Sequence, residues 1–161
     1  MKRAAGMTIV ELVTVLIIVG VIAVTAVSAF NKSAYDTVAA ADRIRAIASY
    51  AQKTATAARR AVKIAITGGT LSLQICRVAT STSALCPGAD YTDLALPNGE
   101  ASYTPSGTIV LSASATIYLD AVGRPADTNG DALETTAPTI SVTGDGTTTV
   151  TVNLQSGYAR Y

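Results

Sequence analysis

The stretch that decides the fold is Met7-Thr8-Ile9-Val10-Glu11-Leu12, which opens an apolar run that continues to about Phe30. A short basic start, residues 1–6, precedes this run, and Glu11 is the one charge inside it. A run of about 20 apolar residues is long enough to cross a bilayer as a helix. A carboxylate within such a run costs about 2.5 kcal/mol or more by insertion scales, so Glu11 is a candidate functional group that needs a partner.

A partner for Glu11 follows from the spacing if the chain is cut after Gly6. The cut would leave an amine on Met7, four residues before Glu11 and one helical turn away. In a packed array, the Glu11 carboxylate of one subunit could neutralise the Met7 amine of the next subunit. The alternative is a signal-anchor helix in which Glu11 is incidental.

The segment Gly6-Met7-Thr8-Ile9-Val10-Glu11-Leu12 resembles the processing site of type IV prepilins and pseudopilins. In that family a glycine precedes Phe or Met, then Thr, two apolar residues, Glu and Leu. The resemblance implies a leader peptide at residues 1–6 that is removed by cleavage after Gly6. It also implies that Met7 is the N-methylated first residue of the mature chain and that Glu11 is the assembly glutamate. Residues 7–30 would then be an apolar half-helix that spans the membrane and later enters a filament core.

From residue 31 to residue 60 the pattern becomes amphipathic. Apolar residues recur in steps of three and four, as on one face of a helix, at Ala41, Ile44, Ala48, Ala51, Ala55 and Ala58. No proline and only one glycine, Gly20, occur between Thr8 and Arg60. We therefore expect one continuous helix, whose second half packs its alanine face against a sheet.

Residues 61–161 are predicted to form the β-rich part of a head that comprises residues 31–161. Alternating apolar residues at 62–66 and 71–75, joined by the turn at 67–70, predict a hairpin. Further strands are predicted at 108–111, 116–119, 139–143, 148–154 and 158–161, whereas residues 87–107 and the tip at 79–84 are expected to be loops. The predicted fold class is α+β and type IV pilin-like, with one long N-terminal helix whose second half packs on an antiparallel β-sheet head.

Within this family, residues 50–62, 117–125 and 157–160 resemble minor pilins of the GspH/FimT kind, including a minor subunit of mannose-sensitive haemagglutinin (MSHA) pili. The resemblance implies a single-pass inner-membrane protein with its head in the periplasm, which later joins a pilus at the cell surface and supports adhesion. The partners it implies are other pilin subunits, a prepilin peptidase and the filament assembly platform. A pseudopilin of a type II secretion system has the same processing site and is the alternative.

Charge is distributed unevenly along the chain. Residues 31–63 carry seven basic and two acidic side chains, whereas residues 64–161 carry three basic and eight acidic ones, a net charge of −5. Some FimT-type minor pilins contact DNA through a basic C-terminal motif, but the corresponding Gly157-Tyr158-Ala159-Arg160 has a single arginine. We therefore expect no nucleic-acid partner, and a DNA-binding minor pilin for DNA uptake is the alternative from another functional class.

Cys76 and Cys86 are the only cysteines. In an exported head the compartment is oxidising, and a disulfide that closes so short a loop would add roughly 2 to 3 kcal/mol of stability. Metal binding is the alternative, although the chain has no histidine and two thiolates alone make a poor zinc site.

Asp127, Asn129 and Asp131 place oxygen-bearing side chains at alternate positions, as a calcium loop does, and Glu134 is near. The order of residues departs from the EF-hand, because Gly130 precedes the third ligand. Turns rich in Asp and Asn adopt this pattern without an ion. Calcium is therefore a weak candidate, and no other cofactor is expected.

Catalysis is not expected. Without histidine the chain cannot form a Ser-His-Asp or Cys-His arrangement, and the glycines at residues 68–69 lack the lysine of a phosphate-binding loop. The sequence thus predicts a structural minor subunit of a type IV pilus or a related filament, and not an enzyme.

Overall fold

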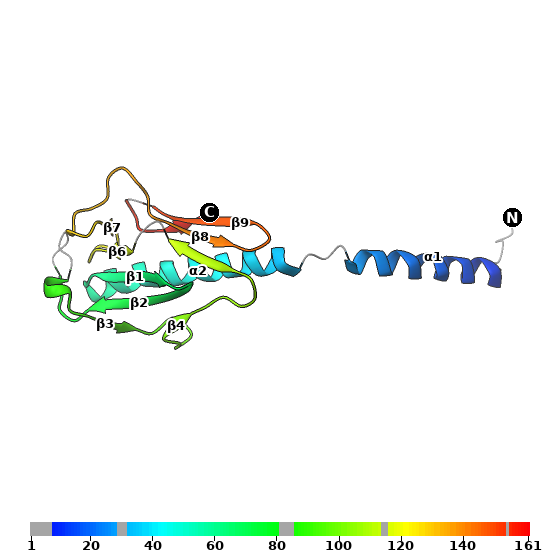
Figure 1. Cartoon of the computed structure of the whole chain (residues 1–161), viewed down its shortest axis with the longest axis horizontal. Coiled ribbons are helices and arrows are strands. Elements are labelled where there is room, and N and C mark those ends of the chain that lie inside the picture. Colours follow the sequence, from blue (N-terminus) through cyan, green and yellow to red (C-terminus); the bar gives the residue numbers. More distant parts are fainter. Residues whose placement is uncertain (1–7, 29–31, 81–85, 114–115, 154) are drawn as a thin grey trace, which may run out of the picture. The chain divides into compact units, whose positions relative to one another are not determined.

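The computed structural model describes residues 8–28, 32–80, 86–113, 116–153 and 155–161. The chain forms two compact units, Met1–Lys32 and Ser33–Tyr161. Helix α1 (Ile9–Ser28) belongs to the first unit, and helix α2 (Lys32–Ala58) runs through the second (Figure 1). The predicted single helix would pass through residues 29–31, which lie outside the described residues.

Helix α2 ends at Ala58 in a Schellman motif. Arg59 has the left-handed φ of 50°, and the Arg60 N–H donates to the Ala55 carbonyl at 3.1 Å, which satisfies one of the free carbonyls at the helix end. A residue other than glycine in this conformation costs about 1 kcal/mol. Because the chain turns away here, Ala58 is exposed, and the prediction that it continues the buried face was wrong.

The buried side of α2 is an alanine face, as the sequence predicted. Ala41, Ala51 and Ala55 have no exposed surface, and Ile44 is equally buried between them. These residues share one hydrophobic core with side chains from two β-sheets. In Figure 1 both sheets lie along α2, so this single helix supports the whole head.

The first sheet has the strand order β3-β2-β1-β6-β7, with β4 also paired to β2. Its strands are β1 (Val62–Thr67), β2 (Thr70–Cys76), β3 (Tyr91–Leu94), β4 (Ser102–Tyr103), β6 (Ile117–Leu119) and β7 (Pro125–Ala126). All its pairs are antiparallel, and the β1–β2 register from Val62↔Ile75 to Thr67↔Thr70 confirms the predicted hairpin.

The second sheet has the order β10-β9-β8-β5. Its strands are β5 (Val110–Ala113), β8 (Thr139–Thr143), β9 (Thr147–Val152) and β10 (Ala159–Arg160), again all antiparallel. The predicted strands near residues 139–143, 148–154 and 158–161 are therefore present. β5 lies slightly later than the predicted 108–111, because the pairing Leu111↔Val142 sets its position.

The expectation that residues 87–107 form only a loop was wrong. This segment contains the 3₁₀ turn η1 (Pro87–Ala89) and the strands β3 and β4. Both strands pair with β2, from Cys76↔Tyr91 to Leu71↔Tyr103. Their extended conformation therefore depends on pairing with β2, and not on a pattern in their own residues. Part of the predicted loop tip at 79–84 lies outside the described residues, which resume at Cys86.

The turn after β6 touches the chain that follows β9, and this contact joins the two sheets. A Cβ atom at Gly157 would lie 1.7 Å from the Gly123 carbonyl oxygen, and Gly157 has a φ of +67°. Gln52 of α2 lies against both glycines and donates from Nε2 to the Ser156 carbonyl at 3.2 Å. We call this contact among Gly123, Gly157 and Gln52 the seam.

We predict that Gly157→Ala destabilises the folded chain by about 2 to 4 kcal/mol, because the methyl group would collide with the Gly123 carbonyl and strain a left-handed backbone. The measurement is urea unfolding of the full chain in detergent. Gly146→Ala is the matched control, since nothing lies within 4 Å of its added Cβ. Equal stability of the two variants would contradict the seam as a tight contact.

Candidate assembly interface

Helix α1 begins with a capping interaction that involves the predicted assembly glutamate. Thr8 Oγ1 accepts a hydrogen bond from the Glu11 backbone N–H at 3.3 Å, and Thr8-Ile9-Val10-Glu11 has the spacing of a capping box. A carboxylate in the first turn also interacts favourably with the helix dipole. Glu11 therefore stands exposed in the first turn of α1. Gly6 and Met7, the predicted processing residues, lie outside the described residues.

From Ile9 to Ile22, α1 is largely apolar and its large apolar side chains are exposed on every side. Its large exposed apolar residues are Ile9, Val10, Leu12, Val13, Val15, Leu16, Ile17, Ile18, Val19, Val21 and Ile22. Ile9 is 84% exposed and Ile22 is 60% exposed, so the exposure extends along the helix and not only at its end. A helix that is apolar on every side is normally buried, either inside a protein assembly or in a membrane.

Among the residues that the structure describes, no helix combines the length and the hydropathy that crossing a membrane requires. The predicted span, residues 7–30, begins and ends outside the described residues.

The two cysteines form a disulfide, as the sequence predicted. The Cys76 and Cys86 sulfurs are 2.06 Å apart and their Cα atoms 5.3 Å apart, and both residues are buried against Ala61 and Tyr91. Burial also raises the pKa of the Tyr91 hydroxyl. The bridge ties the end of β2 to the start of η1 and so fixes the beginning of the strand β3 that follows.

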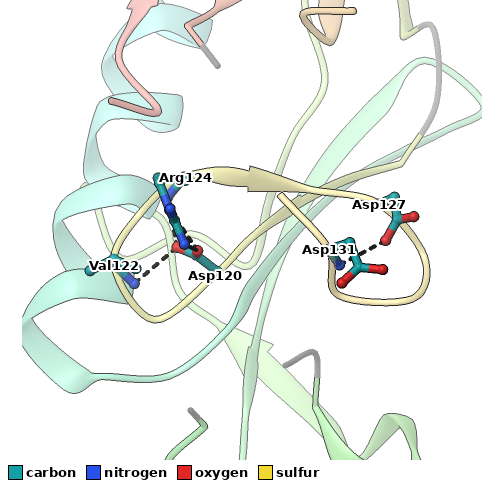
Figure 2. Close-up of polar contacts among 5 residues, drawn as sticks. All are labelled: Asp120, Val122, Arg124, Asp127 and Asp131. Atoms are coloured by element: carbon teal, nitrogen blue, oxygen red, sulfur yellow. Dashed lines mark hydrogen bonds and ion pairs between the residues drawn. The ribbon is translucent and has the colours of Figure 1, made fainter. Parts of the chain in front are cut away.

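Asp120 and Arg124 form an ion pair in which the Asp120 carboxylate is buried and the Arg124 side chain is partly exposed (Figure 2). Asp120 Oδ1 accepts from the N–H groups of Val122 and Arg124 at 2.9 and 2.8 Å, and Oδ2 accepts from Arg124 Nε at 3.0 Å. Asp120 is 1% exposed, so these bonds compensate the burial of its charge. The sequence feature that could have indicated this turn is an Asp four residues before an Arg, with Gly123 between them.

The carboxylate of Asp127 closes the loop that the sequence offered as a calcium site (Figure 2). Its Oδ1 accepts from the backbone N–H of Asp131 at 2.9 Å. Oδ1 also accepts from the backbone N–H of Asn129 at 2.8 Å, and Oδ2 accepts from Asn129 Nδ2 at 3.3 Å. The Asp131 N–H, and then the Asn129 groups, hold the pKa of Asp127 below its ordinary value. The loop is thus an Asx turn in which Asp127 has protein partners.

The candidate calcium ligands are only partly brought together. Asp127, Asn129 and Asp131 share one turn, whereas Glu134 lines a hollow of about 430 Å³ with Arg124 and Gln155. In the described parts of the chain, no three His, Cys, Asp or Glu side chains are grouped so that they could hold a metal ion. Calcium was only a weak candidate from the sequence, and nothing here tests it.

We predict that Asp127 stabilises the loop at neutral pH and loses this effect in acid. Because its folded pKa lies below 3.8, its ordinary value, the ionised form is favoured by folding, and the stabilisation is lost as the pH falls through the folded pKa. The measurement is NMR titration of Asp127 together with urea unfolding of Asp127→Asn at several pH values. The control is Asp131→Asn, since Asp131 contributes its backbone N–H to the turn. An Asp127 midpoint above 3.8 would contradict this assignment.

The C-terminal segment is fastened to α2. The Tyr161 hydroxyl donates to the Asp42 carboxylate, and the Tyr161 ring centroid is 5.4 Å from the Arg45 guanidinium. Arg45 Nε also donates to the Ala159 carbonyl at 3.3 Å. Partial desolvation and then the Asp42 carboxylate raise the pKa of Tyr161.

Comparison of the sequence with protein-family models gives no match, and comparison with curated proteins gives none either. Among solved structures, the chain is similar to the minor pseudopilin EpsH from the type 2 secretion system of Vibrio cholerae. The TM-score is 0.56 at 11% identity, and the match covers 78% of this chain and 94% of that chain. The fold is type IV pilin-like.

The type IV minor pilin FimU of Pseudomonas aeruginosa strain PAO1 also matches, in two crystal forms. In space group P21 the TM-score is 0.49 at 18% identity, covering 76% of this chain and 84% of that chain. In space group P65 the TM-score is 0.48 at 17% identity, covering 76% and 89%. The predicted fold class is confirmed by the likeness to EpsH, whereas the closer resemblance to MSHA-type pili stays a prediction.

Proposed function

We propose that the chain is a structural, non-catalytic subunit of a type IV pilin-like filament and that it assembles through its N-terminal helix. The observation that carries the proposal is helix α1. Its large apolar residues from Ile9 to Ile22 are exposed on every side, and its single charge, Glu11, lies in the first turn. The pilin-like fold of the head supports it. A filament core made of such helices would cover this apolar surface.

Before assembly, we propose that the chain is held in the bacterial inner membrane by the apolar run of residues 7–30, with its head in the periplasm. Cleavage after Gly6 by a prepilin peptidase would expose the Met7 amine. In the filament, apolar helices of neighbouring subunits would replace lipid, and Glu11 would pair with the Met7 amine of the next subunit. A Cβ atom at Gly20 would have no heavy atom within 4 Å, which leaves room for a close helix neighbour.

The proposed partners are other pilin subunits, the prepilin peptidase and the filament assembly platform. We propose no nucleic acid among them, because residues 64–161 carry a net charge of −5 and would repel phosphates.

Two kinds of filament fit this proposal. The sequence resemblance favours a minor subunit of a type IV pilus, and the likeness to EpsH favours a minor pseudopilin of a type II secretion system. Deletion of the gene distinguishes them. Loss of surface pili or adhesion with normal secretion supports the pilus, and loss of secreted hydrolases with normal piliation supports the pseudopilus.

We predict that Gly6→Arg blocks processing, because the peptidase of this class reads a glycine before the cut. The variant should stay in the membrane at its full length of 161 residues, while the wild-type chain should begin at Met7. Mass spectrometry of the N-terminus is the measurement. A wild-type start at another residue would exclude the proposed cleavage site.

We predict that Glu11→Val leaves membrane insertion unchanged or improved but lowers incorporation into filaments about tenfold, because the Met7 amine loses its partner. The measurement is the ratio of this chain in sheared filaments to that in membranes. Thr14→Val is the matched control. It removes a polar group from the same helix, where Thr14 Oγ1 donates only locally to the Val10 carbonyl at 2.7 Å, and it keeps Glu11. Wild-type incorporation of Glu11→Val would count against the pairing.

A further inference from the structure

The turn at residues 96–100, between β3 and β4, combines two features that favour a reaction of its asparagine. The side chain of Asn98 folds back on its own backbone in an Asx turn, because its Oδ1 accepts from the Glu100 N–H at 3.2 Å. The next residue is Gly99, and its lack of a side chain leaves its backbone nitrogen accessible. Asn98 and Gly99 are both exposed to water.

We infer that Asn98 is a site of spontaneous deamidation, with water as the co-reactant. The Gly99 N–H gives its proton to water or hydroxide, and the nitrogen attacks Cγ of Asn98. The new C–N bond forms as the bond from Cγ to Nδ2 breaks, and Nδ2 takes a proton from solvent and leaves as ammonia. Water then opens the cyclic imide at either of its C–N bonds, which gives aspartate or isoaspartate. The net reaction consumes water and releases ammonia, and no atom is oxidised or reduced.

The Asx turn supplies orientation and charge stabilisation for this reaction. Because Oδ1 of Asn98 is held toward Glu100, Cγ stays near the nitrogen of Gly99, which lies between them in the chain. Reacting atoms need a separation of about 3 to 3.5 Å. Negative charge develops on Oδ1 as the nitrogen adds, and the Glu100 N–H already donates to that oxygen.

Asn129 also precedes a glycine but lacks this arrangement. Its Nδ2 donates to Asp127 Oδ2 at 3.3 Å, so the amide is held by Asp127. Gly130 is buried, whereas Gly99 is exposed. Each glycine N–H donates to a carbonyl of its own turn, at 2.8 Å for Gly99 and 3.2 Å for Gly130, so this bond slows both reactions. The difference between the two sites therefore comes from the side chain of the asparagine and from access of water.

Asn153 has the turn without the glycine. Its Oδ1 accepts from the N–H groups of Gln155 and Ser156, both at 3.0 Å, but Leu154 follows it in the sequence. A side chain on the following residue hinders the approach of that residue's nitrogen. Among the asparagines that the structure describes, only Asn98 combines an Asx turn with a following glycine.

Deamidation would change the contact between this turn and α2. Asn98 lines a hollow of about 330 Å³ together with Arg43, whose Nη2 is 2.9 Å from Glu100 Oε2. Aspartate would add a second carboxylate to this hollow, and a guanidinium has enough donors for both. Isoaspartate would lengthen the main chain between Leu96 and Glu100, where the Leu96 N–H donates to the Glu100 carbonyl at 2.8 Å. The aspartate product should thus keep the turn, and the isoaspartate product should loosen it.

The test is incubation of the folded full chain in detergent at neutral and mildly alkaline pH, with each asparagine followed by peptide mass spectrometry. Asn98 should convert about tenfold faster than Asn129 and Asn153, since orientation of the reacting groups changes rates by such factors. Alkaline pH should accelerate the conversion, because the Gly99 nitrogen reacts once it has lost its proton. In the urea-unfolded chain Asn98 and Asn129 should convert at similar rates, because both precede glycine and neither turn is present.

Asn98→Gln is the matched variant, because its longer side chain closes a less favourable ring. It should show no conversion at position 98 and unchanged conversion at Asn129. In the isoaspartate product of the wild type, hydrogen exchange of the Leu96 N–H should be faster, whereas the aspartate product should keep its protection.

Three results would overturn the inference: conversion of Asn98 no faster than that of Asn129 in the folded chain, the same ratio of the two rates in the folded and unfolded chains, or an intact Asn98 in the folded chain while the unfolded chain reacts. The reaction needs no other subunit. Its failure would therefore leave the proposed filament function untouched, and failure of the chain to enter filaments would leave this inference untouched.

Discussion

The close approach of two sheets to one alanine-lined helix is the constraint on which the head depends. Ala41, Ala51 and Ala55 have no exposed surface, so the space between this helix face and the sheets is filled. Closely packed interiors respond to extra volume with strain or displaced backbone. Leu73 of the first sheet and Ile140 of the second belong to the same core, and a larger side chain on this helix face would therefore disturb both sheets.

The two helices differ in whether their apolar side chains are covered by the rest of the chain. Helix α2 buries its apolar side within its own unit, whereas α1 presents its large apolar side chains outward from Ile9 to Ile22. The residues that stabilise the head are thus different from the residues of α1 that need an apolar environment outside the chain. This separation would let α1 exchange one apolar environment for another without repacking of the head core.

Features coded by neighbouring residues could be predicted from the sequence. The β1–β2 hairpin follows from alternation around Gly68 and Gly69, and the alanine face of α2 follows from steps of three and four. The disulfide was inferred from the compartment and from a short loop. Thr8 could have been identified as a cap from its spacing to Glu11.

Features that depend on distant partners could not be predicted in the same way. Strand β3 contains Asp93 and has little alternation, and its pairing with β2 decides its conformation. The burial of Asp120 depends on a turn that brings the backbone N–H of Val122 and the guanidinium of Arg124 to one carboxylate.

The seam has a consequence for the order in which the head is completed during synthesis. Gln52 and Gly123 are made well before Gly157, and β9 gains its partner β10 only with Ala159 and Arg160. We expect the first sheet to form on α2 while the second stays open, since contacts between distant segments form late. Protease sensitivity of ribosome-held chains, with and without residues 153–161, would show this. The growing chain would then remain open to proteolysis until residues 153–161 are made.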